Sequence, residues 1–358
     1  MSLNLKCIKC NKIFPFDIGL TTCPDHDNRY GYLEVINNPL NFHSNLTNNN
    51  CLDLGQTKTP LIKADNFAKL IGVPNFYIKN EGENPTGSFK DRENFIFFNF
   101  LIKNKIKKTI YVISSGNAAL STAAYANKSG YECICYIPKK TSEQKKDLIK
   151  YYGGKLIELN GSYEEIYNKI IKNPPTGINA TPGICPLKEE GDKLIAYEIF
   201  EELGIPDKII VPCGNGTLLW SIYKGFKEIK EAGKTKKMPK MIGVQIKGGD
   251  PIAKAIKESK DYVSLINAPN SVAEGIIATE SYSSAKVVKA INETDGKMIS
   301  VSDGELISAH NQVIKLESIT PELTSSSVYA AVKKLKINSD ETIVCINTGN
   351  QTKKKLAN

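Results

Sequence analysis

The chain has 358 residues, of which 41% are hydrophobic and 24% charged, and its formal net charge is +9. This length predicts two to three domains with a large buried core, and the composition is typical of a globular protein. No apolar run approaches the ~18 residues that a membrane-spanning helix needs. The first residues also lack the apolar segment of a secretion signal. We therefore expect a cytoplasmic protein with no membrane partner.

The positive charge comes almost entirely from lysine. Of the 47 basic residues only Arg29 and Arg92 are arginines. Recognition of nucleic acids favours the guanidinium group, whereas lysines scattered along a chain are typical of a solvated surface. We therefore expect no nucleic-acid partner. A zinc-ribbon protein that binds nucleic acid through its lysines is the alternative among non-enzymes.

A metal-binding module is predicted at the start of the chain, over residues 1–34. Cys7 and Cys10 form one pair of candidate ligands, and Cys23 and His26 form a second pair after twelve intervening residues. Two tight turns that each present two such ligands can close a tetrahedral zinc site. The segment is too short for a hydrophobic core, so zinc would supply the missing stability. A three-ligand site and unused thiols are the alternatives.

Strand and helix patterns alternate after an asparagine-rich linker over residues 35–58. Strands are expected over residues 76–79, 109–113, 132–137, 155–159, 208–211, 241–245 and 342–346. Helices are expected over residues 89–102, 117–128, 142–152, 163–171, 194–203, 218–231, 283–292, 303–315 and 324–335. This alternation predicts an α/β protein with two doubly wound, mostly parallel sheets.

A loop rich in proline and glycine, residues 174–186, indicates a boundary between the two sheets. We expect a small α/β domain over residues 92–180. The large domain is expected to combine residues 59–91 with residues 181–358.

Parallel sheets bind ligands at the carboxyl ends of their strands, and four segments in such places carry small polar residues. The first, Asn84–Arg92, opens a helix. Pro85 and Gly87 shape a tight turn there, and Lys90 follows in the first helical turn. An unprotonated lysine amine in such a setting is the group that imine chemistry requires. A surface lysine is the alternative interpretation.

The second and third segments favour anion binding. Ser114–Ala119 opens a helix, where free backbone N–H groups can bind a carboxylate. Cys213–Thr217 combines two glycines with a threonine hydroxyl between a strand and a helix, which suits a phosphate. It lacks the lysine of a nucleotide P-loop and the G-x-G-x-x-G spacing, so neither ATP nor NAD is expected. An ordinary tight turn is the alternative.

The fourth segment, Asn347–Asn350, follows the last predicted strand. Thr348 offers a hydroxyl that could face a ring nitrogen. A plain terminal loop is the alternative.

Together these segments resemble the fold type II pyridoxal-phosphate enzymes and, among them, the threonine synthases. The cysteine ribbon, Thr59–Leu61 and residues 191–199 fit the same resemblance, which runs from about residue 7 to 350. It implies that Lys90 binds pyridoxal 5′-phosphate (PLP) as a Schiff base and is the catalytic residue. The further cofactor-binding residues that it implies are Asn117, Gly214, Asn215, Gly216, Thr217, Leu218 and Thr348.

The resemblance also implies an activity and a quaternary structure. The expected reaction is the PLP-dependent conversion of O-phosphohomoserine and water to threonine and phosphate, by a lyase that is commonly a homodimer. A neutral hydroxyl from Thr348 at the pyridine nitrogen would favour elimination and replacement over transamination. The expected substrate-binding residues are Ser114, Ser115, Arg92 and Lys188.

Three departures from the threonine synthase pattern bear on the substrate. Lys188 stands where these enzymes often carry an arginine, Ser318 stands where a glycine is usual, and residues 347–351 lack the common T-G-H-G form. The late segment and the ribbon also resemble cysteate synthase, which uses O-phosphoserine. A β-replacing or dehydratase enzyme of the same fold is therefore the alternative function.

Overall fold

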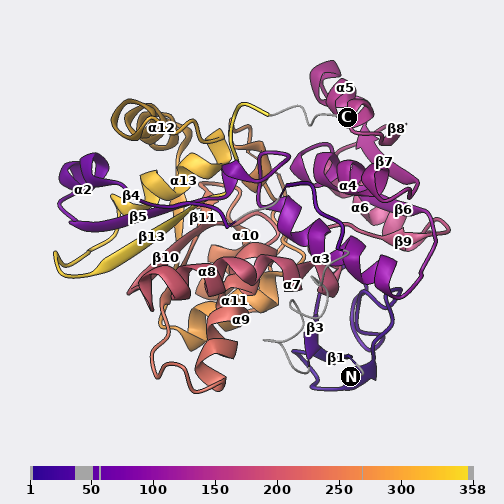
Figure 1. Cartoon of the computed structure of the whole chain (residues 1–358), viewed down its shortest axis with the longest axis horizontal. Helices are drawn as coiled ribbons and strands as arrows, with labels where there is room; N and C mark the ends of the chain where they lie inside the picture. Colours follow the sequence, from indigo (N-terminus) through magenta and orange to yellow (C-terminus); the bar gives the residue numbers. More distant parts are fainter. Residues whose placement is uncertain (1–2, 37–50, 56–57, 268, 354–358) are drawn as a thin grey trace. The chain divides into compact units, whose positions relative to one another are not determined.

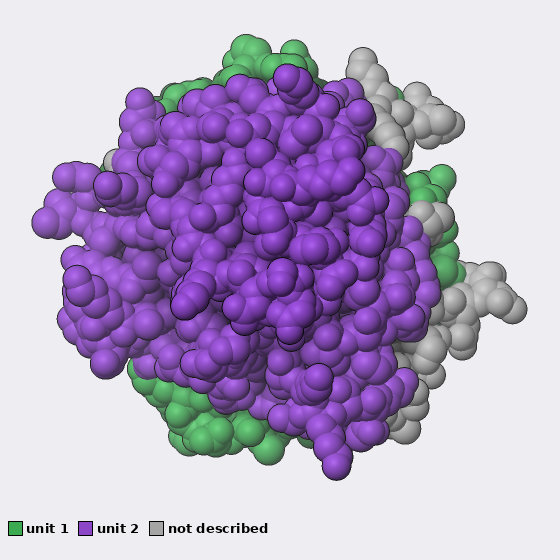
Figure 2. All heavy atoms as spheres, turned by 90° about the vertical axis from the view of Figure 1, so that its left-hand side faces the viewer, with its two compact units in different colours: residues 1–56, 90–192, 356–358 green, residues 57–89, 193–355 purple. Residues whose placement is uncertain are grey.

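The computed structural model describes residues 3–36, 51–55, 58–267 and 269–353 (Figure 1). The chain divides into two units, which Figure 2 colours separately. Unit 1 comprises residues 1–56, 90–192 and 356–358, and unit 2 comprises residues 57–89 and 193–355. Most of the expected linker, residues 37–50 and 56–57, lies outside the described residues. No helix in the described part of the chain is long and apolar enough to cross a membrane.

A six-stranded sheet forms the centre of unit 2. Its strand order is β12-β11-β10-β13-β5-β4, and every pairing is parallel except that of the edge strand β4. The strands are β4 (Leu61–Lys63), β5 (Asn75–Asn80), β10 (Lys208–Pro212), β11 (Lys240–Ile246), β12 (Lys297–Val301) and β13 (Thr342–Asn347). Strands β10 and β13 are runs of β-branched residues with almost no exposed side chain, as expected for a sheet covered on both faces.

Helices cover both faces of this sheet. Figure 1 shows α2, α12 and α13 on one face and α8, α9 and α11 on the other. The elements are α2 (Asp65–Ile71), η1 (Glu81–Glu83), α8 (Leu194–Leu203), α9 (Thr217–Glu231), α10 (Pro251–Lys257), η2 (Glu274–Ile276), α11 (Ser284–Glu293), α12 (Asp303–Glu317) and α13 (Leu323–Val332). The carboxyl ends of β10 and β13 lead directly into the third and fourth predicted segments.

Unit 1 contains a four-stranded parallel sheet of order β8-β7-β6-β9. Its elements are α3 (Lys90–Lys103), β6 (Ile110–Ile113), α4 (Asn117–Lys128), β7 (Cys133–Pro138), α5 (Glu143–Tyr151), β8 (Lys155–Leu159), α6 (Tyr163–Lys172), β9 (Ile178–Asn179) and α7 (Pro186–Asp192). Buried Phe97, Val112 and Ala123 belong to its core. Alanine-rich α4 can pack closely because small side chains line its inner face.

A three-stranded antiparallel sheet of order β2-β1-β3 completes unit 1. It contains β1 (Asn4–Cys7), β2 (Ile13–Pro15) and β3 (Leu33–Ile36). A Cβ atom at Gly31 would clash with the backbone oxygen of Gly183, so the module approaches the rest of unit 1 at backbone distance.

The prediction of an α/β protein with mostly parallel sheets is confirmed. Each expected strand and helix is present, with ends within three residues of the expected ones. The expected domain boundary near residue 180 differs from the structure, which places residues 181–192 in unit 1. The reason is that α7 packs against α3: a Cβ at Gly191 would clash with the backbone oxygen of Arg92. The loop over 174–186 also contains β9, which pairs with β6.

Candidate active site

The loop that leads to Lys90 is held by the segment after β13. This lysine loop, residues 84–89, belongs to unit 2, and its Phe89 N–H donates to the Thr348 carbonyl at 3.0 Å. The buried hydroxyl of Ser88 has no hydrogen-bond partner among the described residues. The structure therefore brings together the first and fourth predicted segments, which are more than 250 residues apart in sequence.

A lysine near the end of the described chain also holds this loop. Lys353 Nζ donates to the Gly87 carbonyl at 3.0 Å and forms an ion pair with Glu322 at 2.7 Å. The Asn350 N–H donates to the same carbonyl at 3.0 Å. Sequence reasoning missed this contact because Lys353 lies in a short basic run that reads as a solvated tail.

Thr348 is buried and has a defined hydroxyl partner. Its Oγ1 lies 2.7 Å from Ser325 Oγ on α13, and Ser325 also accepts a hydrogen bond from the Gly349 N–H at 3.0 Å. The structure thus orients the Thr348 hydroxyl. Nothing in the spacing of the sequence identified Ser325 as its partner.

The glycine-rich segment after β10 forms a tight turn into α9. Gly216 has φ +97°, and a Cβ there would clash with Val287. A Cβ at Gly214 would lie 2.7 Å from the carbonyl oxygen of Gly275. Both glycines are therefore required by backbone conformation or by close approach.

The turn fits a phosphate group. Thr217 is only 4% exposed, and its hydroxyl has no hydrogen-bond partner among the described residues. It is the first residue of α9, a helix of 15 residues whose first-turn N–H groups and positive dipole end favour an anion. A buried, unpartnered hydroxyl at a helix start is costly unless a ligand uses it.

In unit 1, Lys90 shares a carboxylate with Lys188. The Lys90 ammonium donates to Glu93 Oε1, one turn further along α3. The other oxygen, Oε2, lies 3.7 Å from Lys188 Nζ on α7, and both side chains are completely buried. Burial lowers the pKa of Lys188, whereas the nearby Glu93 carboxylate raises it. Sequence reasoning named both lysines and missed the glutamate between them.

A buried polar network continues from this cluster. Lys188 Nζ donates to Thr122 Oγ1 at 3.2 Å, and Thr122 Oγ1 donates to Asn94 Oδ1 at 3.2 Å. Asn94 Nδ2 donates to Ser121 Oγ at 2.8 Å, and Ser121 donates to Asp91 at 2.6 Å. Networks of this kind fix side-chain positions because each lost bond leaves a buried group unsatisfied.

The remaining predicted site residues of unit 1 lie at the starts of α3 and α4. Ser114, Ser115 and Asn117 are half-buried, and the Gly116 N–H donates to Ser114 Oγ at 3.2 Å. Arg92 is only 3% exposed on α3. Burial of this kind also suits a structural role for Arg92, in which the side chain fixes the start of the helix.

The predicted zinc ligands converge in the N-terminal module. One ligand atom from each of Cys7, Cys10, Cys23 and His26 lies within 4.8 Å of the others. The buried His26 Nε2 has no hydrogen-bond partner in the described part of the chain. Burial raises the pKa of Cys23 to about 12, and a metal is the usual means of deprotonating such a thiol.

The carboxylates next to His26 are engaged elsewhere. Asp25 pairs with Lys12 at 2.7 Å, and Asp27 pairs with Arg29 at 2.6 Å. Neither carboxylate is therefore placed to replace the His26 imidazole as a metal ligand.

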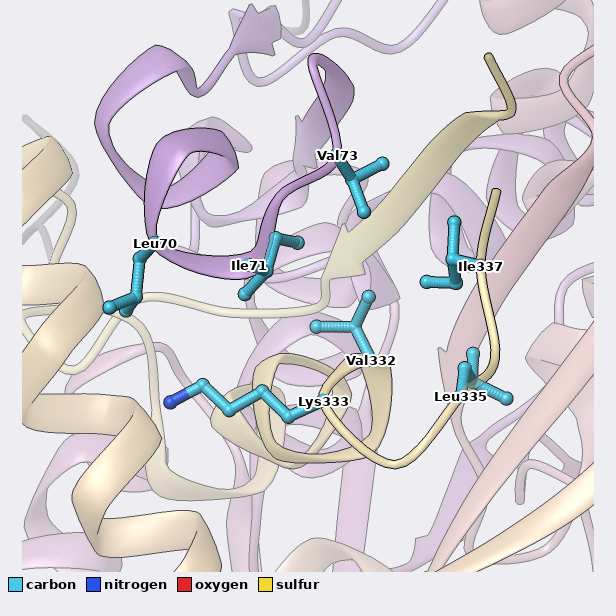
Figure 3. Close-up of a pocket in the computed structure, with 7 residues that line it drawn as sticks. All are labelled: Leu70, Ile71, Val73, Val332, Lys333, Leu335 and Ile337. Carbon is cyan, nitrogen blue, oxygen red and sulfur yellow. The ribbon is translucent and has the colours of Figure 1, made fainter. Parts of the chain in front are cut away.

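A cavity of about 360 Å³ lies elsewhere in unit 2 (Figure 3). It is lined by Leu70, Ile71, Val73, Val332, Lys333, Leu335 and Ile337. None of the predicted site residues lines it. Its walls are aliphatic, and Lys333 is the one polar side chain among the seven lining residues.

Comparison with known proteins identifies the class. Residues 52–349 match the family described as pyridoxal-phosphate dependent enzyme. The chain belongs to this family. Among solved structures, the processed form of threonine deaminase isoform 2 from Solanum lycopersicum has a TM-score of 0.70 and 24% identity, covering 83% of this chain and 84% of that one. Maize serine racemase has a TM-score of 0.71 and 20% identity, covering 83% and 89%. These two likenesses show the fold alone.

Within the family, similar curated proteins include several threonine synthases. That of Methanocaldococcus jannaschii is 32% identical, with 97% of this chain and 92% of that protein covered. That of Methanosarcina acetivorans is 31% identical, with 98% and 92% covered. That of Halalkalibacterium halodurans is 32% identical, with 84% of each covered. The resemblance seen in the sequence is confirmed.

Proposed function

We propose that the protein is a threonine synthase, a PLP-dependent lyase that converts O-phosphohomoserine and water to threonine and phosphate. The observation that carries this proposal is the similarity to threonine synthases over nearly the whole of both chains. The buried Thr217 hydroxyl at the start of α9 supports it, because it suits the cofactor phosphate.

The residues that would hold PLP are those that the sequence resemblance implies. Lys90 would bind the cofactor's aldehyde carbon. The turn from Gly214 to Leu218 would bind its phosphate through backbone N–H groups and the Thr217 hydroxyl. Asn117 would donate to the ring oxygen. Thr348, oriented by Ser325, would face the ring nitrogen.

The cofactor, when bound, supplies an electron sink that makes removal of the substrate's Cα proton feasible. In the proposed mechanism the Lys90 amine takes that proton and later returns one, so a single residue serves as base and acid. The start of α4, with Ser114 and Ser115, binds the substrate α-carboxylate through its N–H groups. Lys188 and Arg92 supply positive charge for the substrate phosphate. Both are buried, so the phosphate would be bound away from bulk water.

A substrate panel tests the proposal. Purified protein supplied with PLP should release phosphate and form threonine from O-phosphohomoserine, with far lower rates on O-phosphoserine and threonine. The second candidate is a β-replacing or dehydratase enzyme of the same fold, favoured by Lys188 in the place of the usual arginine, since an ammonium binds phosphate without a bidentate fork. Preferred turnover of O-phosphoserine or threonine would establish that candidate instead.

We also propose that the N-terminal module binds one structural zinc ion through Cys7, Cys10, Cys23 and His26. The convergence of four ligand atoms supports this site. Elemental analysis of protein prepared without chelator should find one zinc per chain, and Cys23→Ser should lose it. Protein without zinc would refute the site, and a Cys23→Ser protein that retains zinc would refute the ligand assignment.

We infer a cytoplasmic homodimer that binds a small amino-acid substrate and no nucleic acid. Sedimentation at micromolar concentration tests the dimer. The purified protein should be yellow from bound PLP, whereas a colourless protein that binds nucleic acid would support the non-enzyme alternative.

A further inference from the structure

Glu93 is a buried acid that the proposed mechanism does not use. Its side chain is completely buried, and its two oxygens face two different amines, those of Lys90 and Lys188. Oxygen Oε2 has no hydrogen-bond partner among the described residues. Burying a charged carboxylate costs free energy unless nearby groups of opposite charge or hydrogen bonds compensate it. The position of Glu93 between two amines therefore calls for an explanation.

The geometry around the carboxylate is unequal. Lys90 makes a direct hydrogen bond to Oε1. Lys188 approaches Oε2 only to 3.7 Å and makes its hydrogen bond to Thr122 instead. One carboxylate therefore serves two amines, and it binds the one that carries the proposed chemistry more closely.

We propose that Glu93 is a positioning residue for Lys90, whose ammonium form it holds at the start of α3, and that Lys188 opposes this hold. The inference rests on the proposed role of Lys90 as the cofactor-binding lysine. Opposite charge favours an ammonium and like charge disfavours it, so the two neighbours act on Lys90 in opposite directions. Only a neutral amine condenses with an aldehyde, with loss of one water molecule, so the cluster sets the pH at which cofactor is captured.

Other titratable groups lie near the cluster on the elements packed around α3. Cys185 precedes α7, and burial raises its pKa to about 11, so that thiol is neutral near pH 7. Cys133 lies on β7 and also acts on Lys188. On α3 itself, Asp91 is bound by Ser121. None of these groups is altered in the variants below, so they act equally in each.

The test measures covalent capture of PLP by the full-length protein as a function of pH. Protein freed of cofactor is incubated with PLP, the bond is reduced with borohydride, and the labelled peptide is identified by mass. Glu93→Gln should shift the midpoint of capture to lower pH by about one unit. Lys188→Met should shift it to higher pH. Glu93→Asp, which keeps the charge, should stay close to the wild type.

Glu143→Gln is the matched control. Glu143 also pairs with a lysine three residues along a helix of unit 1, Lys146 at 2.8 Å, but its side chain is 74% exposed. Its midpoint should equal that of the wild type. Thermal melting checks the fold, and the Lys188→Met arm retains the test if Glu93→Gln does not fold.

The outcomes separate the inference from the proposed function. A wild-type label on a residue other than Lys90 would refute the role of that lysine. A label on Lys90 with midpoints that do not move, or that move in the same direction in Glu93→Gln and Lys188→Met, would refute the inference alone. A purely structural Glu93 cannot produce opposite shifts.

Discussion

Two buried lysine–glutamate pairs, whose lysines are five residues apart in the sequence, differ in geometry. In unit 2, Lys193 donates to both oxygens of Glu228, each at 2.9 Å, and Tyr197 donates to the same carboxylate. In unit 1, Lys188 lies 3.7 Å from one oxygen of Glu93. Both lysines are completely buried.

The Lys193–Glu228 pair is a satisfied ion pair, in which both carboxylate oxygens are bound, whereas the Glu93 carboxylate is shared between two lysines. A carboxylate bound at both oxygens offsets the desolvation of its lysine, so the Lys193 pair suits a structural role. The Glu93 carboxylate is divided between two amines, and burial lowers the pKa of Lys188. Incomplete compensation of this kind is typical of sites where a proton has to move. Four variants test this distinction.

The largest effect is expected from Lys90→Ala, which removes one of the two amines that share the Glu93 carboxylate. The variant should lose covalently bound PLP and all turnover. The reason is that Lys90 is the lysine that follows the lysine loop and stands at the start of a helix, the setting that the proposed mechanism requires. The variant should still fold, since one amine, that of Lys188, remains near Glu93. Absorbance, borohydride trapping and threonine formation measure the loss. An active variant that still binds PLP covalently would contradict the proposed mechanism.

Glu228→Gln tests the satisfied pair. It leaves the Lys193 ammonium buried without its carboxylate, which typically costs about 3–5 kcal/mol in free energy of unfolding. Urea unfolding measures this cost, and PLP capture should keep the wild-type pH midpoint in the folded protein. A Lys193→Met, Glu228→Leu double variant should recover most of the stability. A Glu228→Gln loss below about 1 kcal/mol would show that this pair is no better compensated than an exposed one.

Lys188→Ala tests whether the shared lysine also serves the substrate. It should raise KM for a phosphorylated substrate about 10-fold, which corresponds to about 1.4 kcal/mol of binding free energy. The KM for an unphosphorylated substrate should stay almost unchanged. Lys140→Ala, an exposed lysine of unit 1, is the control. Equal changes in both KM values would remove Lys188 from the phosphate site and leave it only its place beside Glu93.

The candidate site could be predicted from the sequence only in part. Lys90 and the Gly214–Leu218 turn could be identified because fixed local patterns carry them: a strand, a tight turn and a helix start. Such patterns need no knowledge of distant contacts.

Glu93 and α7 could not be identified in this way. An acid in the first turn of a helix is ordinarily a solvated residue that favours the dipole, so Glu93 attracts no notice. Helix α7 has seven residues including Pro186 and Gly191, and it follows a loop rich in both residue types, so its propensity is weak. Only the packing of α7 against α3 buries Glu93 and brings Lys188 to it. The Ser325 hydroxyl beside Thr348 likewise depends on pairing between distant segments.

The smallest effect is expected in the pH dependence of stability of Lys188→Met. Burial lowers the folded-state pKa of Lys188, so between that value and the ordinary lysine pKa of about 10.4 the unfolded chain binds more protons than the folded one. Stability of the wild type must therefore rise with pH across that window. The cost of burying Lys188 is fully present below the window and disappears above it.

Lys188→Met removes this titration and keeps an apolar stem of similar length. Near neutral pH the variant should be more stable by about 1 kcal/mol, the low end of what replacing buried ionic groups by apolar ones has given. The gain should shrink to nothing as the pH approaches 10.4. Lys193→Met, measured alongside by urea unfolding at each pH, should instead lose stability, because it strands a well-bound carboxylate. If both methionine variants lose stability at neutral pH, the two pairs are alike, and the contrast between a satisfied and a shared carboxylate does not hold.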